Sequence, residues 1–182
     1  MQILETERLI LRPFREDDLD ALASLFANRD FMRFSGSENG YPREQTAFVL
    51  GKFVGWNLAG VPSQFAVIWR DNKEMIGYCG FLHQELDGEK LIEIGYRLDS
   101  RYWNRGIATE AAHAVRDHAF RDLHLKHVVS FIHPENHASR RVAEKNGMTL
   151  EKQSTFRGFP TLVFGIRRPP SSTVRLPVDP KS

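Results

Sequence analysis

Hydrophobic and polar residues alternate along this chain with a period that changes between residues 92 and 121. Ile92, Ile94 and Tyr96 alternate with other residues at period two, which predicts a β-strand. A polar turn follows at residues 99–101, and the period then becomes that of one helix face. The small and apolar residues on this face are Ala108, Ala111, Ala112, Val115 and Ala119. A strand therefore leads through a turn containing Gly106 into a helix.

The remaining elements are predicted from the same two periods. Strands are expected at residues 6–14, 64–70, 75–84, 126–133, 149–156 and 161–167, and helices at residues 16–28, 42–58 and 135–146. Residues 28–42 read as an irregular aromatic segment, and residues 158–160 as the turn between the last two strands. This order predicts a mixed α/β domain over residues 1–168, with helices packed on one sheet. The Pro- and Ser-rich residues 169–182 read as a loosely held tail.

The turn before the helix at Ala108 has the physical features of an anion site. Several backbone N–H groups are unpaired at a helix N-terminus, and the helix dipole adds partial positive charge there. Gly106 and Ala108 are small enough to let a diphosphate approach the backbone. The chain lacks the spacing G-x-G-x-x-G of dinucleotide sites and the G-K-[ST] of P-loops. A phosphate-bearing ligand of another kind is therefore indicated.

Composition excludes several classes of function. The chain has 182 residues and a formal net charge of +2, a small excess that argues against a dedicated nucleic-acid binder. Its one cysteine, Cys79, allows no internal disulfide and is consistent with a reducing compartment. No charged-then-apolar leader and no long apolar run are present, so neither secretion nor membrane spanning is expected. We expect a cytoplasmic protein with no nucleic-acid or membrane partner.

Four segments of the chain resemble the GCN5-related N-acetyltransferase (GNAT) superfamily, and most of all its ribosomal-protein-alanine N-acetyltransferase branch. They are the opening TERLILRPFREDDLD, the central IEIGYRLDSRYWNRGIATEA, the later HPENHASRRVAEKNGM and the final strand pair. Together they cover about residues 5 to 167. The resemblance implies the acyl-CoA N-acyltransferase fold, a splayed and mostly antiparallel sheet of about seven strands with helices on both faces.

The same resemblance implies acetyl-CoA as the acetyl donor, with no metal. In the family's six-residue loop Gln or Arg comes first, Gly fourth and Gly or Ala sixth, and Trp103 here replaces the usual first residue. The loop amides would hold the diphosphate, and the pantetheine would run beside the strand and the later helix. The cofactor-binding residues implied in this way are Tyr96, Arg97, Leu98, Asn104, Arg105, Gly106, Ile107, Ala108, Thr109, Asn136 and Ser139.

Acetyl transfer to an amine needs a base, donors for the oxyanion and a proton for the leaving thiolate. Glu93 is the candidate base, although it could also be an exposed carboxylate or a salt-bridge partner. His83 and His133, at strand ends, are alternative bases. The position where many family members carry a Tyr general acid falls at Ala143, so Ser139 is the candidate proton donor. A backbone N–H at Tyr96 or Leu98 would stabilise the oxyanion.

The acceptor groove is expected between the segment joining the first two helices and the final hairpin. The candidate acceptor-binding residues are Phe31, Phe34, Tyr41, His83 and Phe156, with Arg33 and Arg157 as nearby cations. The predicted activity is acetylation of a protein N-terminal α-amine. Two alternatives stay open: acetylation of a small amine such as a polyamine, amino acid or antibiotic, and a non-catalytic CoA-binding module. Dimers are common in the family, and an exposed edge at the last strand could form a homodimer.

Overall fold

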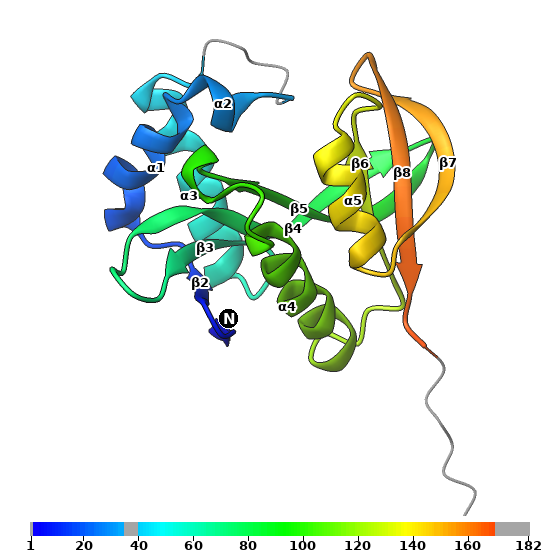
Figure 1. Ribbon diagram of the computed structural model, residues 1–182, viewed down its shortest axis with the longest axis horizontal. Helices are drawn as coiled ribbons and strands as arrows, with labels where there is room; N and C mark the ends of the chain where they lie inside the picture. The colour runs from blue at the N-terminus through cyan, green and yellow to red at the C-terminus, as the bar shows by residue number, and fades with distance from the viewer. Residues whose placement is uncertain (1, 35–39, 170–182) are drawn as a thin grey trace, which may run out of the picture.

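One mixed sheet organises the chain in the computed structural model, which describes residues 2–34 and 40–169. These residues form an eight-stranded sheet in the order β1-β2-β3-β4-β5-β6-β8-β7 (Figure 1). The strands are β1 (Leu4–Glu5), β2 (Leu9–Pro13), β3 (Gln64–Trp69), β4 (Met75–Leu86), β5 (Glu89–Leu98), β6 (His127–Ile132), β7 (Thr149–Phe156) and β8 (Phe159–Arg167). The α/β class is confirmed, and the two-residue β1 accounts for the one strand beyond the expected seven.

The sheet splays between β5 and β6, its one parallel pair. Strands β4 and β5 pair continuously, from Gly77 opposite Leu98 to Leu86 opposite Glu89. Strands β5 and β6 pair at a single position, where Glu93 lies opposite Val129. The carboxyl half of β5 therefore lacks a strand neighbour on its β6 side. This gap in the sheet positions the site described below.

Helices cover both faces of the sheet, as expected. They are α1 (Leu19–Phe26), α2 (Arg29–Met32), α3 (Arg43–Leu58), α4 (Ile107–Arg121) and α5 (His137–Lys145), with short 3₁₀ turns η1 (Glu16–Asp18) and η2 (Ser100–Tyr102). In Figure 1 the helices α1–α3 (blue to cyan) lie together, away from α4 and α5 (green to yellow). Strand β3 shows the two faces, because Phe65 and Val67 pack in the core under α4 while Ala66 and Ile68 pack under α1 and α3.

Three details differ from the sequence-based prediction. The segment after α1 contains the short helix α2, which begins because the Asn28 side chain accepts hydrogen bonds from the N–H groups of Asp30 and Phe31. Strand β8 begins at Phe159, since the turn consists of Arg157 and Gly158, both with positive φ. The exposed edge is β7, because the last strand pairs on both sides.

The described residues contain neither a membrane-spanning helix nor a cluster of metal-ligating side chains. No helix among them is long and apolar enough to cross a membrane. Within residues 2–34 and 40–169, no group of three His, Cys, Asp or Glu side chains is placed to share a metal ion. The tail predicted from residue 169 onward lies, apart from Pro169, outside the described residues.

Candidate functional site

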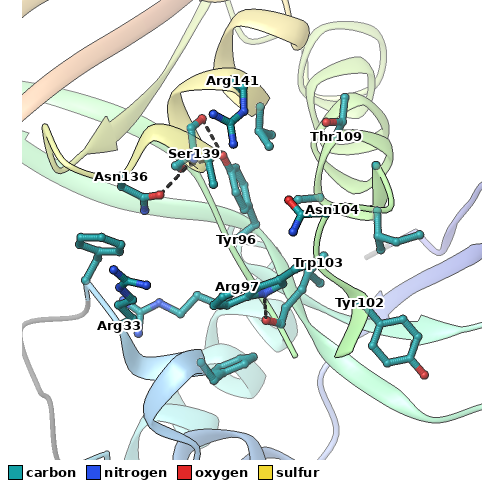
Figure 2. Close-up of a pocket in the computed structure, with 18 of the residues that line it drawn as sticks. Arg33, Tyr96, Arg97, Tyr102, Trp103, Asn104, Thr109, Asn136, Ser139 and Arg141 are labelled. Atoms are coloured by element: carbon teal, nitrogen blue, oxygen red, sulfur yellow. Dashed lines mark hydrogen bonds between the residues drawn. The ribbon is translucent and has the colours of Figure 1, made fainter. Parts of the chain in front are cut away.

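A cleft of about 380 Å³ lies where β5, the start of α4 and α5 meet (Figure 2). Its walls contain most of the residues predicted to bind the cofactor: Tyr96, Arg97, Leu98, Asn104, Gly106, Ile107, Ala108, Thr109, Asn136 and Ser139. These residues come from segments up to 43 positions apart, as Tyr96 and Ser139 show. The fold therefore joins the two motifs that the sequence placed on separate elements.

The start of α4 offers unpaired backbone donors to this cleft. Gly106 is the N-cap residue, with a left-handed φ of 76°, and it has no side chain to bond the first N–H groups. Residues Ile107, Ala108 and Thr109 follow it along the cleft wall. Because a helix N-terminus also carries partial positive charge, this wall suits an anion.

Tyr96 and Ser139 join β5 to α5 across the cleft. The Tyr96 hydroxyl lies 2.8 Å from Ser139 Oγ and 3.2 Å from the Ser139 carbonyl oxygen, and Figure 2 shows the phenol pointing at this serine. Ser139 is held in turn by its own N–H, which donates to Asn136 Oδ1 at 3.1 Å. Burial raises the pKa of Tyr96, so the phenol stays protonated and can donate a hydrogen bond.

A second cavity, of about 760 Å³, adjoins the first. Both cavities share Arg33, Phe34 and Arg97 in their walls. The second is lined further by predicted acceptor-side residues, namely Tyr41, Glu93, His133 and Phe156. Of the other two acceptor candidates, Phe31 lines the first cavity, and His83 lines neither. The ring of His83 instead packs against Trp56, with Nε2 at 2.8 Å from the Pro62 carbonyl oxygen.

Glu93 is a buried carboxyl group in the wall of the second cavity. It is 8% exposed, and it accepts hydrogen bonds from Gln84 Nε2 at 2.7 Å and from the Phe131 N–H at 3.3 Å. Burial raises its pKa, and this effect outweighs the opposing hydrogen bonds and the nearby Arg97 and Arg157. Among the residues that the structure describes, Glu93 forms no ion pair. The exposed-carboxylate and salt-bridge interpretations of this residue are therefore wrong.

Comparison with known proteins assigns the family. The family described as an acetyltransferase (GNAT) domain matches residues 8–149, which is most of the chain. The chain belongs to the GNAT family. It is an N-acetyltransferase, as are several relatives by name. The chain is 32% identical over 149 residues to a Bacillus subtilis protein named uncharacterized N-acetyltransferase YoaA, covering 82% of this chain and 84% of that one. It is 33% identical over 155 residues to the B. subtilis protein YkkB, at 82% and 86% coverage.

Solved acetyltransferase structures agree with the fold. An acetyltransferase from Agrobacterium tumefaciens superimposes with a TM-score of 0.77 at 32% identity, covering 92% of this chain and 95% of that one. RimL, a ribosomal L7/L12 α-N-protein acetyltransferase solved in complex with coenzyme A, superimposes with a TM-score of 0.78 at 21% identity, covering 92% and 98%. The second likeness supports the fold alone.

Within this GNAT domain, Arg105 differs from its neighbours in the loop. Its side chain lies outside the cleft, with the guanidinium 5.3 Å from the Trp69 ring centre and 5.6 Å from that of Tyr102. Its carbonyl oxygen accepts a hydrogen bond from Arg8 Nη1 at 2.9 Å. Arg105 therefore shapes the loop through its backbone.

Sequence reasoning missed two features of the site. The first is Glu110, which accepts hydrogen bonds from Thr6 Oγ1 at 2.6 Å, the Arg8 N–H at 2.9 Å and Arg8 Nε at 2.7 Å. These three hydrogen bonds, called the brace below, hold the opening segment against the first turn of α4. In the sequence, the sign of the brace was a carboxylate in that first turn. The second is the Tyr96 phenol. Ala143 is 1% exposed and packed in the core, and its methyl group has no proton to donate.

Proposed function

We propose that this chain transfers the acetyl group of acetyl-CoA to a primary amine, most specifically a protein N-terminal α-amine. The observation that carries the proposal is the continuity of the two cavities along β5. One contains the predicted cofactor residues, and the other contains a buried carboxyl group. Donor and acceptor could therefore meet beside Arg97, which lines both.

The hydrogen-bond donors in the wall of the first cavity suit acetyl-CoA. The uncapped N–H groups at Ile107, Ala108 and Thr109 would hold the diphosphate, and Asn136 and Ser139 would contact the pantetheine. The space at Gly106 is open, because a Cβ built there would meet only the Arg8 guanidinium, at 3.6 Å. When bound, acetyl-CoA supplies the activated acyl group.

Glu93 is proposed to accept the proton of the attacking amine, directly or through water. An α-amino group titrates near pH 8, so a good fraction is already neutral at cellular pH. A carboxyl group with a raised pKa is a stronger base than an ordinary one once it is ionised. His133 is the alternative base, since it lies in the same cavity with its ring stacked on Phe34 at 5.5 Å.

Tyr96, with Ser139, is proposed to protonate the leaving thiolate. The amine nitrogen forms a bond to the acetyl carbon, the carbon–sulfur bond breaks, and the sulfur takes its proton from the hydroxyl pair. We expect Tyr96→Phe to lower kcat about tenfold or more, because general acid catalysis contributes roughly 10²–10⁴-fold and Ser139 can still donate. Stopped-flow thiol release measures kcat, and calorimetry should find acetyl-CoA affinity within about twofold of wild type. An unchanged kcat would remove Tyr96 from the proton transfer.

An α-amine acceptor is favoured over a lysine side chain by the chemistry of the two amines. A lysine amine titrates near 10.4, whereas an α-amine titrates near 8. At neutral pH, deprotonation of the lysine amine therefore costs about 3 kcal/mol more than deprotonation of the α-amine.

Thiol release from acetyl-CoA with a panel of acceptors tests the function. The panel contains peptides with a free N-terminus, the same peptides N-formylated but carrying an internal lysine, polyamines, and free amino acids. We expect turnover with free N-termini and little with the blocked lysine peptides. Turnover confined to small amines would support the alternative activity. Tight CoA binding with no turnover of any acceptor would overturn catalysis and indicate a binding module.

Cytoplasmic location and a homodimer stay predictions. Cys79 is a buried free thiol, in keeping with a reducing compartment. The edge strand β7 leaves one side of its backbone without a strand neighbour in the described chain, and a second subunit could pair there. Sedimentation velocity would test the dimer, and a purely monomeric protein at high micromolar concentration would contradict it.

A further inference from the structure

We propose that the acceptor carries a carboxylate close to the amine that is acetylated, and that guanidinium groups around the second cavity bind this carboxylate. The inference rests on the proposed function, because it takes the second cavity as the acceptor site. It goes further by naming the chemical class of the acceptor.

The charge around this cavity is unbalanced. Its wall carries four guanidinium groups and two carboxyl groups, from Arg29, Arg33, Arg97, Arg157, Glu93 and Glu135. Within residues 2–34 and 40–169, none of the four arginines forms an ion pair. They come from α2 and its C-cap, from β5 and from the β7–β8 turn, so the fold brings them together from distant parts of the chain.

The contacts that these arginines do make leave their charge available. The Arg33 guanidinium lies 5.2 Å from the Phe34 ring centre, and that of Arg157 lies 4.9 Å from the Phe156 ring centre. Among the residues that the structure describes, Arg97 Nη1 donates to Met32 Sδ, at 3.5 Å. An aromatic face or a thioether holds a guanidinium in place without neutralising it. Since none of them has an ion-pair partner among the described residues, these side chains are positioned to bind an anion of the acceptor.

The phosphates of the acetyl donor are not that anion. Arg29 and Arg157 line only the second cavity, and the uncapped amides of α4 line only the first. In Figure 2, Arg33 and Arg97 lie on the side of the cleft away from Thr109. Arg29 and Arg157 thus lie toward the acceptor and away from the amides that suit the diphosphate, and Arg33 and Arg97 lie where the two cavities meet.

A carboxylate beside an amine matches the two kinds of charge in this cavity. Glu93 would face the amine, and a guanidinium would bind the carboxylate through two parallel N–H groups. An acceptor that carries only positive charge, such as a polyamine, would be repelled by the arginines. The carboxylate could be an acidic side chain next to a peptide N-terminus or the α-carboxylate of a free amino acid.

Matched acceptors test the proposal. Peptides beginning Ser-Asp-Glu are compared with peptides beginning Ser-Asn-Gln, and free aspartate is compared with aspartate diamide. We expect kcat/KM to favour the carboxylate member of one pair by about tenfold or more, the range of a hydrogen bond to a charged group. The favoured pair identifies the source of the carboxylate. The preference should weaken at high salt, because three of the four arginines are exposed.

Arginine variants assign the preference to this cavity. Arg157→Gln and Arg97→Gln should each reduce the ratio several-fold, whereas Arg168→Gln, which removes an exposed charge outside both cavities, should leave it unchanged. Equal use of acid and amide acceptors by the wild type would overturn the proposal. So would a preference that survives both cavity variants.

A binding measurement separates this inference from the proposed function. Calorimetry with CoA-loaded protein compares the acidic and amide peptides without any turnover. Preferential binding of the acidic peptide without acetylation would contradict the proposed function and leave the inference standing. Acetylation of both peptides, and of aspartate and its diamide, with equal affinity and rate within each pair would contradict the inference alone.

Discussion

At the scale of single residues, the catalytic role proposed for Glu93 has a cost in stability. Its pKa is raised by burial, so ionisation is less favourable in the folded protein than in the unfolded chain. The stabilising contribution of the neutral form is complete below the ordinary carboxyl pKa and is lost as the pH rises through the raised value. Above its raised pKa, the ionised Glu93 therefore reduces the free energy of unfolding.

Glu93→Gln should consequently lower activity and increase stability. We expect kcat/KM to fall about 100-fold, in the lower range for loss of a general base. The part of the pH–rate profile that reports the ionisation of Glu93 should disappear, so that the remaining pH dependence is that of the acceptor amine. The free energy of unfolding at pH 8 should increase, because the neutral amide removes a buried charge. Urea unfolding and initial rates measure the two effects.

The control for this substitution is Glu85→Gln, which makes the same charge change at an exposed position on β4. It should alter neither property. A Glu93→Gln variant with wild-type activity and a retained pH limb would assign the base to another group, and His133 would then be tested.

At the scale of elements, the brace between the opening segment and α4 fixes the cofactor loop. Partial burial alone would raise the pKa of Glu110, but the hydrogen bonds from Thr6 and Arg8 outweigh it and lower the pKa. The brace therefore stabilises the fold above the ordinary carboxyl pKa of about 4.3, and this contribution is lost as the pH falls through the lowered value. Arg8 also holds the Arg105 carbonyl, which links stability to loop geometry.

Glu110→Gln should weaken both the fold and cofactor binding. We expect a loss of about 2 kcal/mol in the free energy of unfolding at pH 7, the size of a charge-assisted hydrogen bond to a partly buried group. The dissociation constant of acetyl-CoA should increase several-fold. Between pH 5 and pH 3 the variant should lose less stability than the wild type. Glu144→Gln, at an exposed position on α5, provides the control. Equal acid sensitivity in both variants would contradict the role of the brace.

Local periodicity and motif spacing predicted the elements better than they predicted side-chain partners. The helical period of the sequence predicted the buried face of α4. Ala111, Val115 and Ala119 are all buried against the sheet, and burial of one helix face is what produces such a period of small and apolar residues. Contacts between distant segments leave no such period. Thr6 meets Glu110 across 104 residues, and Tyr96 meets Ser139 across 43, so neither pair could be read from the sequence. His83 fits a strand-end pattern equally well whether it faces a cavity or packs on Trp56.

At the scale of the whole molecule, the single parallel register pair between β5 and β6 joins two parts of the sheet. The cleft proposed for the cofactor lies across this junction, with the α4 amides and Tyr96 on one side. Ser139 of α5 and Asn136, the N-cap residue of that helix, lie on the other. A ligand that contacts both sides replaces strand pairing that the splay removes. Binding should therefore stiffen the junction as well as the residues that touch the ligand.

Hydrogen exchange with and without CoA tests this coupling. At 100 times the dissociation constant, CoA adds about 2.7 kcal/mol to the free energy of unfolding. We expect slower exchange in the first turns of both α4 and α5 and along β6, while β7, at the far edge, changes little. Gly106→Glu should abolish the effect, because a left-handed residue would be strained and its carboxylate would occupy the anion site. Gly60→Glu, at an open position with a φ of 70°, has the same strain outside the cleft and should bind CoA normally. Protection confined to α4 would show that the ligand does not bridge the two parts.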